Sequence, residues 1–159
     1  MSGYESVSIR ELHQLLIGNC LLFCPLEALI EIAIVQAFSI LEHPAEPDDL
    51  PDAASIWRLP LTQLILTVPG ARRIRFSQGL VGAATSKPTD LLTINLDDVM
   101  LHLHRHRVKT ELPNGQTVGK DSTGHWKTAL LKESPPAVCH VFSACFLQSI
   151  NSCRIDPDV

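Results

Sequence analysis

The sequence predicts an α/β domain in which three or four strands carry helices on both faces. The first observation is a short apolar run at Phe38–Leu41 that follows a long helical segment, which is typical of a buried strand. The second is a pair of strand-like runs, Arg73–Ser77 and Leu91–Leu96, separated by a loop that contains glycine and lysine. A chain of 159 residues with 45% hydrophobic residues and a net charge of −4 has the composition of one globular domain.

The N-terminal segment has a clear helix start. Ser8 and Glu11 have the spacing of a capping box, which predicts a helix from about Ile9 toward Phe23. Pro25 has no amide hydrogen to donate, so we expect it to kink the helix or to start it again. A second helical stretch is expected after this proline.

Turn and cap residues place the elements in the middle of the chain. The first strand is expected to end at Glu42–Pro44, and an acidic loop punctuated by prolines follows it. Asp52 can cap a short helix that continues through Trp57, and Pro60 can begin another that reaches about Val68.

The C-terminal part predicts two more helices. Asp97 is expected to cap the first of them. The range 126–131 has the pattern of a short strand. Ser134 and Pro135 have the pattern of an N-cap followed by an N1 proline, which predicts a last helix through about Ile150.

These elements define the domain organisation. We expect residues 1–159 to form a single, partial domain, with an N-terminal helical segment at 1–37 and an α/β core at 38–150. With so few strands, an exposed sheet edge and a long apolar helix, the chain is expected to have a part supplied by a partner.

The apolar N-terminal segment could be a buried helix or a membrane span. The run without charge, Leu15–Leu26, has 12 residues, and Glu27 and Glu31 follow it. A span needs about 20 predominantly apolar residues. The sequence therefore favours a buried helix over a span.

Charge and cysteine content limit the classes of function. The 13 basic and 17 acidic residues give no overall positive field, so nucleic-acid binding would need a local patch. Five cysteines have no regular spacing, and the polar first residues do not have the pattern of a secretory signal. We expect reduced thiols in an intracellular protein, and the sequence does not indicate the compartment.

One local basic patch does occur. Arg72, Arg73 and Arg75 lie on a strand-like segment, and Lys87 is in the loop that follows. Either a solvated strand face or a surface that contacts phosphate explains this pattern.

Three histidines alternate at His102, His104 and His106. On a strand they would share a face and could hold a metal ion, whereas near the end of a helix they complement the helix dipole. The helix interpretation is favoured, and no metal site is predicted.

Two separated segments carry a family resemblance. The run Leu41–Pro44 resembles a strand ending in Glu-Asn-Val or Glu-Asn-Pro, and Trp57 stands in a run that resembles Trp-x-Leu-Pro. Gln78–Gly82 and Ser86–Thr89 resemble a glycine-containing motif followed by a basic motif. In this order, the segments are similar to the C-terminal half of the catalytic domain of DNA cytosine-5 methyltransferases and their phage-type and protist relatives.

The resemblance implies an incomplete Rossmann-like, methyltransferase-type half domain. By this resemblance Glu42 would contact the edge of a flipped-out base, as enzymes that act on extruded bases require. The residues expected to line the substrate site are Gln78, Gly82 and Lys87, with Arg73 and Arg75 from the basic strand.

The departures from the family weigh against catalysis by the isolated chain. The sequence contains neither a Gly-x-Gly cofactor loop nor the Pro-Cys dipeptide that carries the family's nucleophile. We expect no cofactor in the chain alone, and S-adenosylmethionine only if a partner completes the site. That partner would be an N-terminal half domain or a second copy of the chain.

A non-enzymatic alternative is a structural or protein-interaction module that docks through its apolar N-terminal helix. A concave basic surface that contains Glu42 and Lys87 would favour the methyltransferase-like fragment. An exposed apolar face on Leu15–Ile34, far from any pocket, would favour the interaction module.

Overall fold

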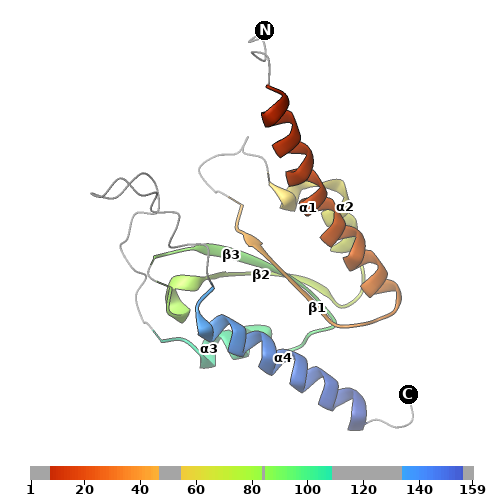
Figure 1. The fold of residues 1–159 in the computed structure, drawn as a ribbon. Helices are drawn as coiled ribbons and strands as arrows, with labels where there is room; N and C mark the ends of the chain where they lie inside the picture. The colour runs from red at the N-terminus through yellow and green to blue at the C-terminus, as the bar shows by residue number, and fades with distance from the viewer. Residues whose placement is uncertain (1–7, 47–54, 84, 109–133, 156–159) are drawn as a thin grey trace.

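The protein is a three-stranded sheet with helices packed on both faces (Figure 1). The computed structural model describes residues 8–46, 55–83, 85–108 and 134–155. The α/β class predicted from the sequence is confirmed. The strand-like run predicted at 126–131 and the helix cap predicted at position 52 lie outside the described residues.

The sheet is antiparallel. It consists of β1 (Ser39–Pro44), β2 (Ala71–Ser77) and β3 (Pro88–Ile94) in the order β1-β3-β2, so β3 is central and pairs with both neighbours. The three strands are close to the predicted positions. A Rossmann-like half domain would need a parallel sheet, so that finer expectation is not confirmed.

The register of the sheet decides which residues share a face. Leu91 lies opposite Glu42 on β1 and Ile74 on β2, while Asp90 lies opposite His43 and Arg75. Because side chains alternate along a strand, Leu91 and Asp90 point to opposite faces. Each face therefore carries a different set of the predicted site residues.

The Asp90 face is covered by α1 (Ile9–Ile34), the 3-10 helix η1 (Ile56–Arg58) and α2 (Pro60–Ile65). Figure 1 shows α1 and α2 side by side on this face. Leu26, Trp57 and Ile65 are buried there against the even-numbered residues of β3. Together they form one of the two cores of the domain.

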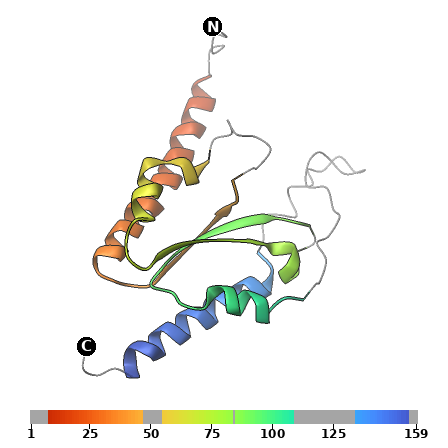
Figure 2. The same cartoon turned by 180° about the vertical axis from the view of Figure 1, so that it is seen from behind.

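The Leu91 face is covered by the 3-10 helix η2 (Gln78–Val81), α3 (Val99–Arg105) and α4 (Pro136–Ile155) (Figure 2). α3 and α4 pack against each other, and the buried residues Val81, Leu103, Val141 and Cys145 join them to the sheet. This is the second core.

The predicted helix boundaries are close to those observed, with local differences. The capping box at Ser8 and Glu11 is confirmed, with the Glu11 amide donating to Ser8 Oγ at 3.2 Å. α1 continues through Pro25 as one helix. The N-cap of α3 is Asp98, not Asp97, and its side chain makes no capping hydrogen bond. α4 begins at Pro136, two residues after the N-cap predicted at 134.

The expectation that the N-terminal helix is buried is wrong for its first half. Every residue from Ser8 to Leu21 is exposed, whereas Leu26 and Leu29 are buried on the sheet. Figure 1 shows the N-terminal half of α1 extending past the sheet. The apolar pattern identified the helix correctly but could not indicate how much of it the domain covers.

Candidate functional site

The predicted site residues divide between the two faces of the sheet. Glu42, Gln78 and Lys87 come together on the face that carries α3 and α4. Arg73 and Arg75 point to the opposite face, beneath η1 and α1. The structure thus brings three of these residues into one cluster and separates the two arginines from them.

Gln78 is the centre of the first cluster. Its Nε2 donates to Glu42 Oε1 at 3.1 Å and to Thr89 Oγ1 at 3.1 Å, and Lys87 Nζ lies 3.4 Å from the same oxygen of Glu42. Gln78 and Thr89 are fully buried, while Glu42 and Lys87 are partly exposed. The arrangement presents a carboxylate and an ammonium group to solvent above a buried amide.

The amide of Gln78 is only half satisfied. Its Oε1 is buried and has no hydrogen-bond partner among the described residues, and the same holds for Oγ1 of Thr85 in the loop that precedes β3. Buried polar groups in folded proteins are nearly always hydrogen-bonded. The cluster therefore offers a buried acceptor to a donor such as water or a polar ligand.

Gly82 has a backbone role. It ends η2 with a φ of 109°, a conformation that side chains with a Cβ rarely adopt. Its amide and that of Ala83 both donate to the carbonyl of Gln78. Gly82 thus shapes the turn that holds Gln78 in place.

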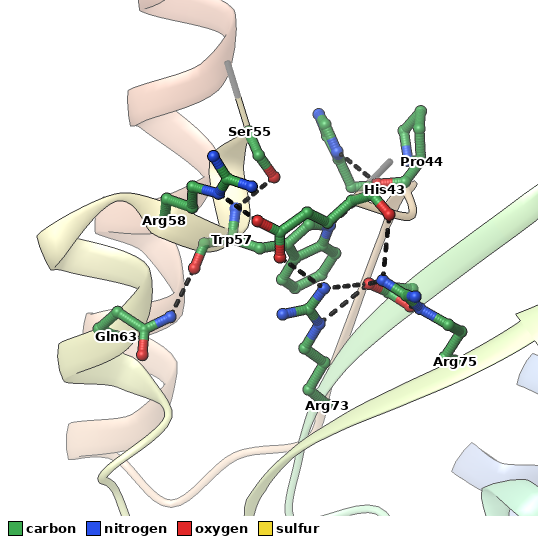
Figure 3. A network of polar contacts seen from close by, with 10 residues as sticks. His43, Pro44, Ser55, Trp57, Arg58, Gln63, Arg73 and Arg75 are labelled. Carbon is green, nitrogen blue, oxygen red and sulfur yellow. Dashed lines mark hydrogen bonds and ion pairs between the residues drawn. The ribbon is translucent and has the colours of Figure 1, made fainter. Parts of the chain in front are cut away.

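The second cluster surrounds Asp90, which is fully buried, and Figure 3 shows its two arginines, Arg73 and Arg75. Arg73 Nε donates to Asp90 Oδ2 at 2.9 Å, and Arg75 Nε donates to Oδ1 at 2.9 Å. Arg73 Nη2 also lies 3.6 Å from Glu46 Oε2. The charge of this basic strand is thus largely balanced by carboxylates of the same chain.

The environment of Asp90 lowers its pKa. Burial is the largest influence and by itself raises the pKa of this carboxyl. Hydrogen bonds from Arg75 and Arg73, together with their positive charges, outweigh burial and bring the pKa below its ordinary value. Asp90 is therefore a charged carboxylate that binds both arginines.

Trp57 connects this cluster to the helical layer. Its Nε1 donates to the carbonyl of Pro44 at 2.9 Å, and the Arg73 guanidinium lies 4.5 Å from its ring centroid. The ring of His43 approaches Trp57 edge-on, with centroids 6.1 Å apart. Figure 3 shows His43, Pro44, Trp57, Arg58 and Arg73 within this network of polar contacts. Arg58 is also ion-paired with Glu46.

Sequence reasoning missed Asp90 and Glu46 as partners of the basic strand. The available signal was the alternation of Arg73 and Arg75, which places two like charges on one face and calls for an acid on the neighbouring strand. The pairing between strands that identifies Asp90 is a property of the folded chain.

The three alternating histidines lie at the C-terminal end of α3, and their side chains have different surroundings. His102 is buried with Nε2 2.8 Å from Gln148 Oε1, and the His106 ring stacks on His140 with centroids 6.3 Å apart. His104 is exposed. Within the described residues there is no group of three or more His, Cys, Asp or Glu side chains that could hold a metal ion.

The exposed half of α1 carries several large apolar residues at the surface. Ile9 is 88% exposed and Leu21 is 72% exposed, and the large residues between them are also open to solvent. By length and composition alone, α1 could cross a membrane. An exposed apolar surface of this kind is normally covered by protein or lipid.

No family model, curated protein or solved structure matches this chain. The resemblance to cytosine-5 methyltransferases therefore rests only on the residues quoted above.

Proposed function

We propose that this protein is a non-enzymatic interaction module that self-associates through the N-terminal half of α1. The observation that supports it is the exposure of every residue from Ser8 to Leu21 on a helix whose continuation is packed into the domain. Apolar surface of this extent usually marks an interaction site.

The spacing of the apolar residues supports a helical partner. Ile9, Leu12, Leu16, Asn19 and Phe23 follow each other at alternating steps of three and four residues, which is the seam of a coiled coil.

Asn19 supports a second copy of the chain as that partner. It is the polar position of the seam, and in a parallel pair of helices in register it would lie opposite Asn19 of the other copy. Two amides can hydrogen-bond to each other, whereas an apolar partner would leave Asn19 unpaired. Asn19 occupies a d position of this seam, and a buried amide without a hydrogen-bond partner is costly, so an asparagine opposite it favours a second copy in register.

The geometry of α1 disfavours a membrane span. The 14 residues from Ser8 to Leu21 that are exposed on all sides extend about 21 Å at 1.5 Å per residue. The hydrocarbon core of a bilayer is about 30 Å thick. Arg10, Glu11 and His13 also lie in the first turns of this segment.

Sedimentation equilibrium on the full chain tests the proposal. The wild-type chain is expected to form an oligomer whose population rises with concentration, and Leu16→Glu should give a monomer because it places a carboxylate in the seam. Leu147→Glu on α4 is the matched control, because Leu147 is similarly exposed but lies far along the chain from the seam.

Two results would contradict self-association. One is a monomeric wild-type chain at all concentrations. The other is an oligomer that Leu16→Glu leaves intact. Flotation of the wild-type chain with lipid vesicles, abolished by Leu16→Glu, would instead identify a bilayer as the surface that covers α1.

A second candidate is supported by the cluster of Glu42, Gln78 and Lys87. Under it, the chain is a methyltransferase-like fragment that is not catalytic alone and binds the edge of a nucleobase. A carboxylate above a buried amide with a vacant acceptor suits a planar ligand that carries both donors and acceptors. The antiparallel sheet gives no support to this candidate.

Titration with deoxycytidine monophosphate tests this second candidate. Glu42→Gln is expected to abolish binding, while Glu31→Gln on the exposed surface of α1 should preserve it. Absence of binding to the wild-type chain, or equal binding by both variants, would count against a base site at Glu42. Binding of S-adenosylmethionine by the isolated chain would overturn the expectation that a partner must supply the cofactor site.

A further inference from the structure

Two exposed cysteines lie on one face of α1. Cys20 and Cys24 are four residues apart on a helix that is continuous from Ile9 to Ile34, and both side chains are exposed. Residues at this spacing are neighbours on the surface of an α-helix. Because α1 continues through Pro25 as one helix, the spacing holds at Cys24 as well. The two thiols are therefore adjacent groups that are both open to solvent.

The spacing of the two cysteines suits a bridging metal ion better than a disulfide. Cβ atoms four residues apart on a helix are separated by about 5 to 6 Å, whereas a disulfide needs about 3.5 to 4.5 Å between them. With a metal–thiolate bond of about 2.3 Å on each side, the two sulfur atoms can lie up to about 4.6 Å apart. Cys20 and Cys24 can therefore share an ion without distortion of α1.

The number of ligands selects the ion. In the part of the chain that the structure describes, no third His, Cys, Asp or Glu side chain joins the two cysteines in a group that could hold a metal. Structural zinc takes four ligands and iron–sulfur clusters take four cysteines. Thiolates also select Cu(I), and this ion is satisfied by two thiolates in a linear arrangement. The pair therefore favours Cu(I) over zinc.

We propose that Cys20 and Cys24 together bind one Cu(I) ion on each chain. The thiolate is the form of cysteine that binds metal, so each thiol releases its proton to the solvent as its Cu–S bond forms. Copper stays in the +1 state and the sulfur atoms are not oxidised, so the step needs no oxidant or reductant. The product is a linear S–Cu–S unit on the surface of α1.

The copper site does not depend on the proposed self-association. Both ligands belong to the same chain, and neither is a residue of the coiled-coil seam. A monomeric chain would therefore keep the site, and an oligomer would carry one ion for each copy. The site is also separate from Glu42, which points to the face of the sheet that carries α3 and α4.

Competition for Cu(I) with the chromophoric chelator bicinchoninate tests the proposal on the full chain, without oxygen and with ascorbate as the reductant. The wild-type chain is expected to withdraw one Cu(I) ion per chain. Changes to residues that only support a metal ligand weaken binding by about 10- to 100-fold. Since Cys20→Ser and Cys24→Ser each remove a direct ligand, either should weaken binding by more than about 100-fold.

Two controls separate the spacing of the thiols from their mere presence. Cys139 and Cys153 are exposed on α4 but lie about 21 Å apart along the helix axis, so Cys139→Ser/Cys153→Ser should bind Cu(I) as the wild type does. Cys24→Ser/Ala28→Cys keeps two cysteines at exposed positions of α1 but separates them by about 12 Å. This variant should bind as weakly as Cys24→Ser alone.

X-ray absorption at the copper edge provides a second readout, in which the loaded wild-type chain should show two sulfur neighbours around each copper. Tight binding that survives in Cys24→Ser, or in Cys24→Ser/Ala28→Cys, would overturn the proposal. So would the loss of binding in Cys139→Ser/Cys153→Ser. One ion for two chains would also overturn it, because the copper would then be shared between copies, and self-association itself would not be contradicted.

Discussion

Arg75 and Asp90 lie directly opposite each other in the β2–β3 ladder, and Arg75 Nε donates to Asp90 Oδ1 at 2.9 Å. Asp90 is fully buried, and Arg73 binds its other carboxylate oxygen from the next position on the same face of β2. A shift of the register by one residue would turn Asp90 toward the core beneath α3 and α4. The Asp90 carboxylate thus binds two arginines of the edge strand β2 and also specifies the register between β2 and β3.

Replacement of this carboxylate is expected to destabilise the fold. Asp90→Asn keeps the shape of the side chain but removes the charge that pairs with both arginines. Loss of one partner of a buried pair costs about 3 to 5 kcal/mol. Because the two arginines are partly exposed and can regain water, we expect a loss of about 2 kcal/mol in the free energy of unfolding, measured with urea at fixed protein concentration.

Asp97→Asn is the matched control for that measurement. Asp97 is an exposed partner of Arg72 at 3.7 Å, and its replacement should change the free energy of unfolding by less than about 0.5 kcal/mol. Similar losses in the two variants would show that the buried network does not stabilise the sheet.

The lowered pKa of Asp90 predicts a dependence of stability on pH. The unfolded chain has an ordinary aspartate pKa of about 4. Since the folded-state pKa lies below that value, the stabilisation is fully present above about pH 4 and is lost as the pH falls through the folded-state pKa. Urea unfolding of wild type and Asp90→Asn at a series of pH values should therefore give curves that converge in acid and separate above about pH 4.

The elements of this fold were largely predictable because their signals are local. The capping box of Ser8 and Glu11, the strand before Glu42 and the proline that begins α2 each act within a few residues, and the structure contains all three features. The direction of the strands is not a local property. The sequence indicated where strands lie, but the antiparallel order β1-β3-β2 depends on contacts between distant segments.

The candidate site was predictable only in part for the same reason. Glu42, Gln78 and Lys87 are adjacent in space, although 36 residues separate the first two. The role of Asp90 was missed because Arg75, which it binds, lies 15 residues away in the sequence. The apolar pattern of α1 likewise shows that the helix avoids water but not which surface covers it.

Gly82 and Gly18 are expected to respond oppositely to alanine. Gly82 has a φ of 109°, so Gly82→Ala should lower the free energy of unfolding by about 1 to 2 kcal/mol through backbone strain. The strain is conformational, since the nearest atom to an added Cβ is at an ordinary contact distance of 3.5 Å in Val108.

Gly18→Ala provides the comparison. Gly18 is within α1 and an added Cβ would have no atom within 4 Å, so alanine should raise helix stability by up to about 1 kcal/mol. Thermal unfolding followed by helical circular dichroism separates the two effects. A neutral Gly82→Ala would show that η2 can end without a left-handed residue.

The five cysteines are expected to fall into one protected and four accessible thiols. Cys145 lies on α4 and is buried in the second core, and burial, with a smaller contribution from the charge of Asp98, raises the pKa of its thiol to about 11. The thiolate is the reactive form, so Cys145 should not react with a disulfide reagent at about pH 8 until the chain unfolds. Four cysteines are exposed and should react within the native state: Cys20, Cys24, Cys139 and Cys153.

The measurement is best made on the Leu16→Glu chain, in which association cannot shield α1. Cys139→Ser should reduce the number of rapidly reacting thiols from four to three, whereas Cys145→Ser should leave that number at four. A fifth rapid thiol would mean that the core beneath α3 and α4 opens readily in the native protein.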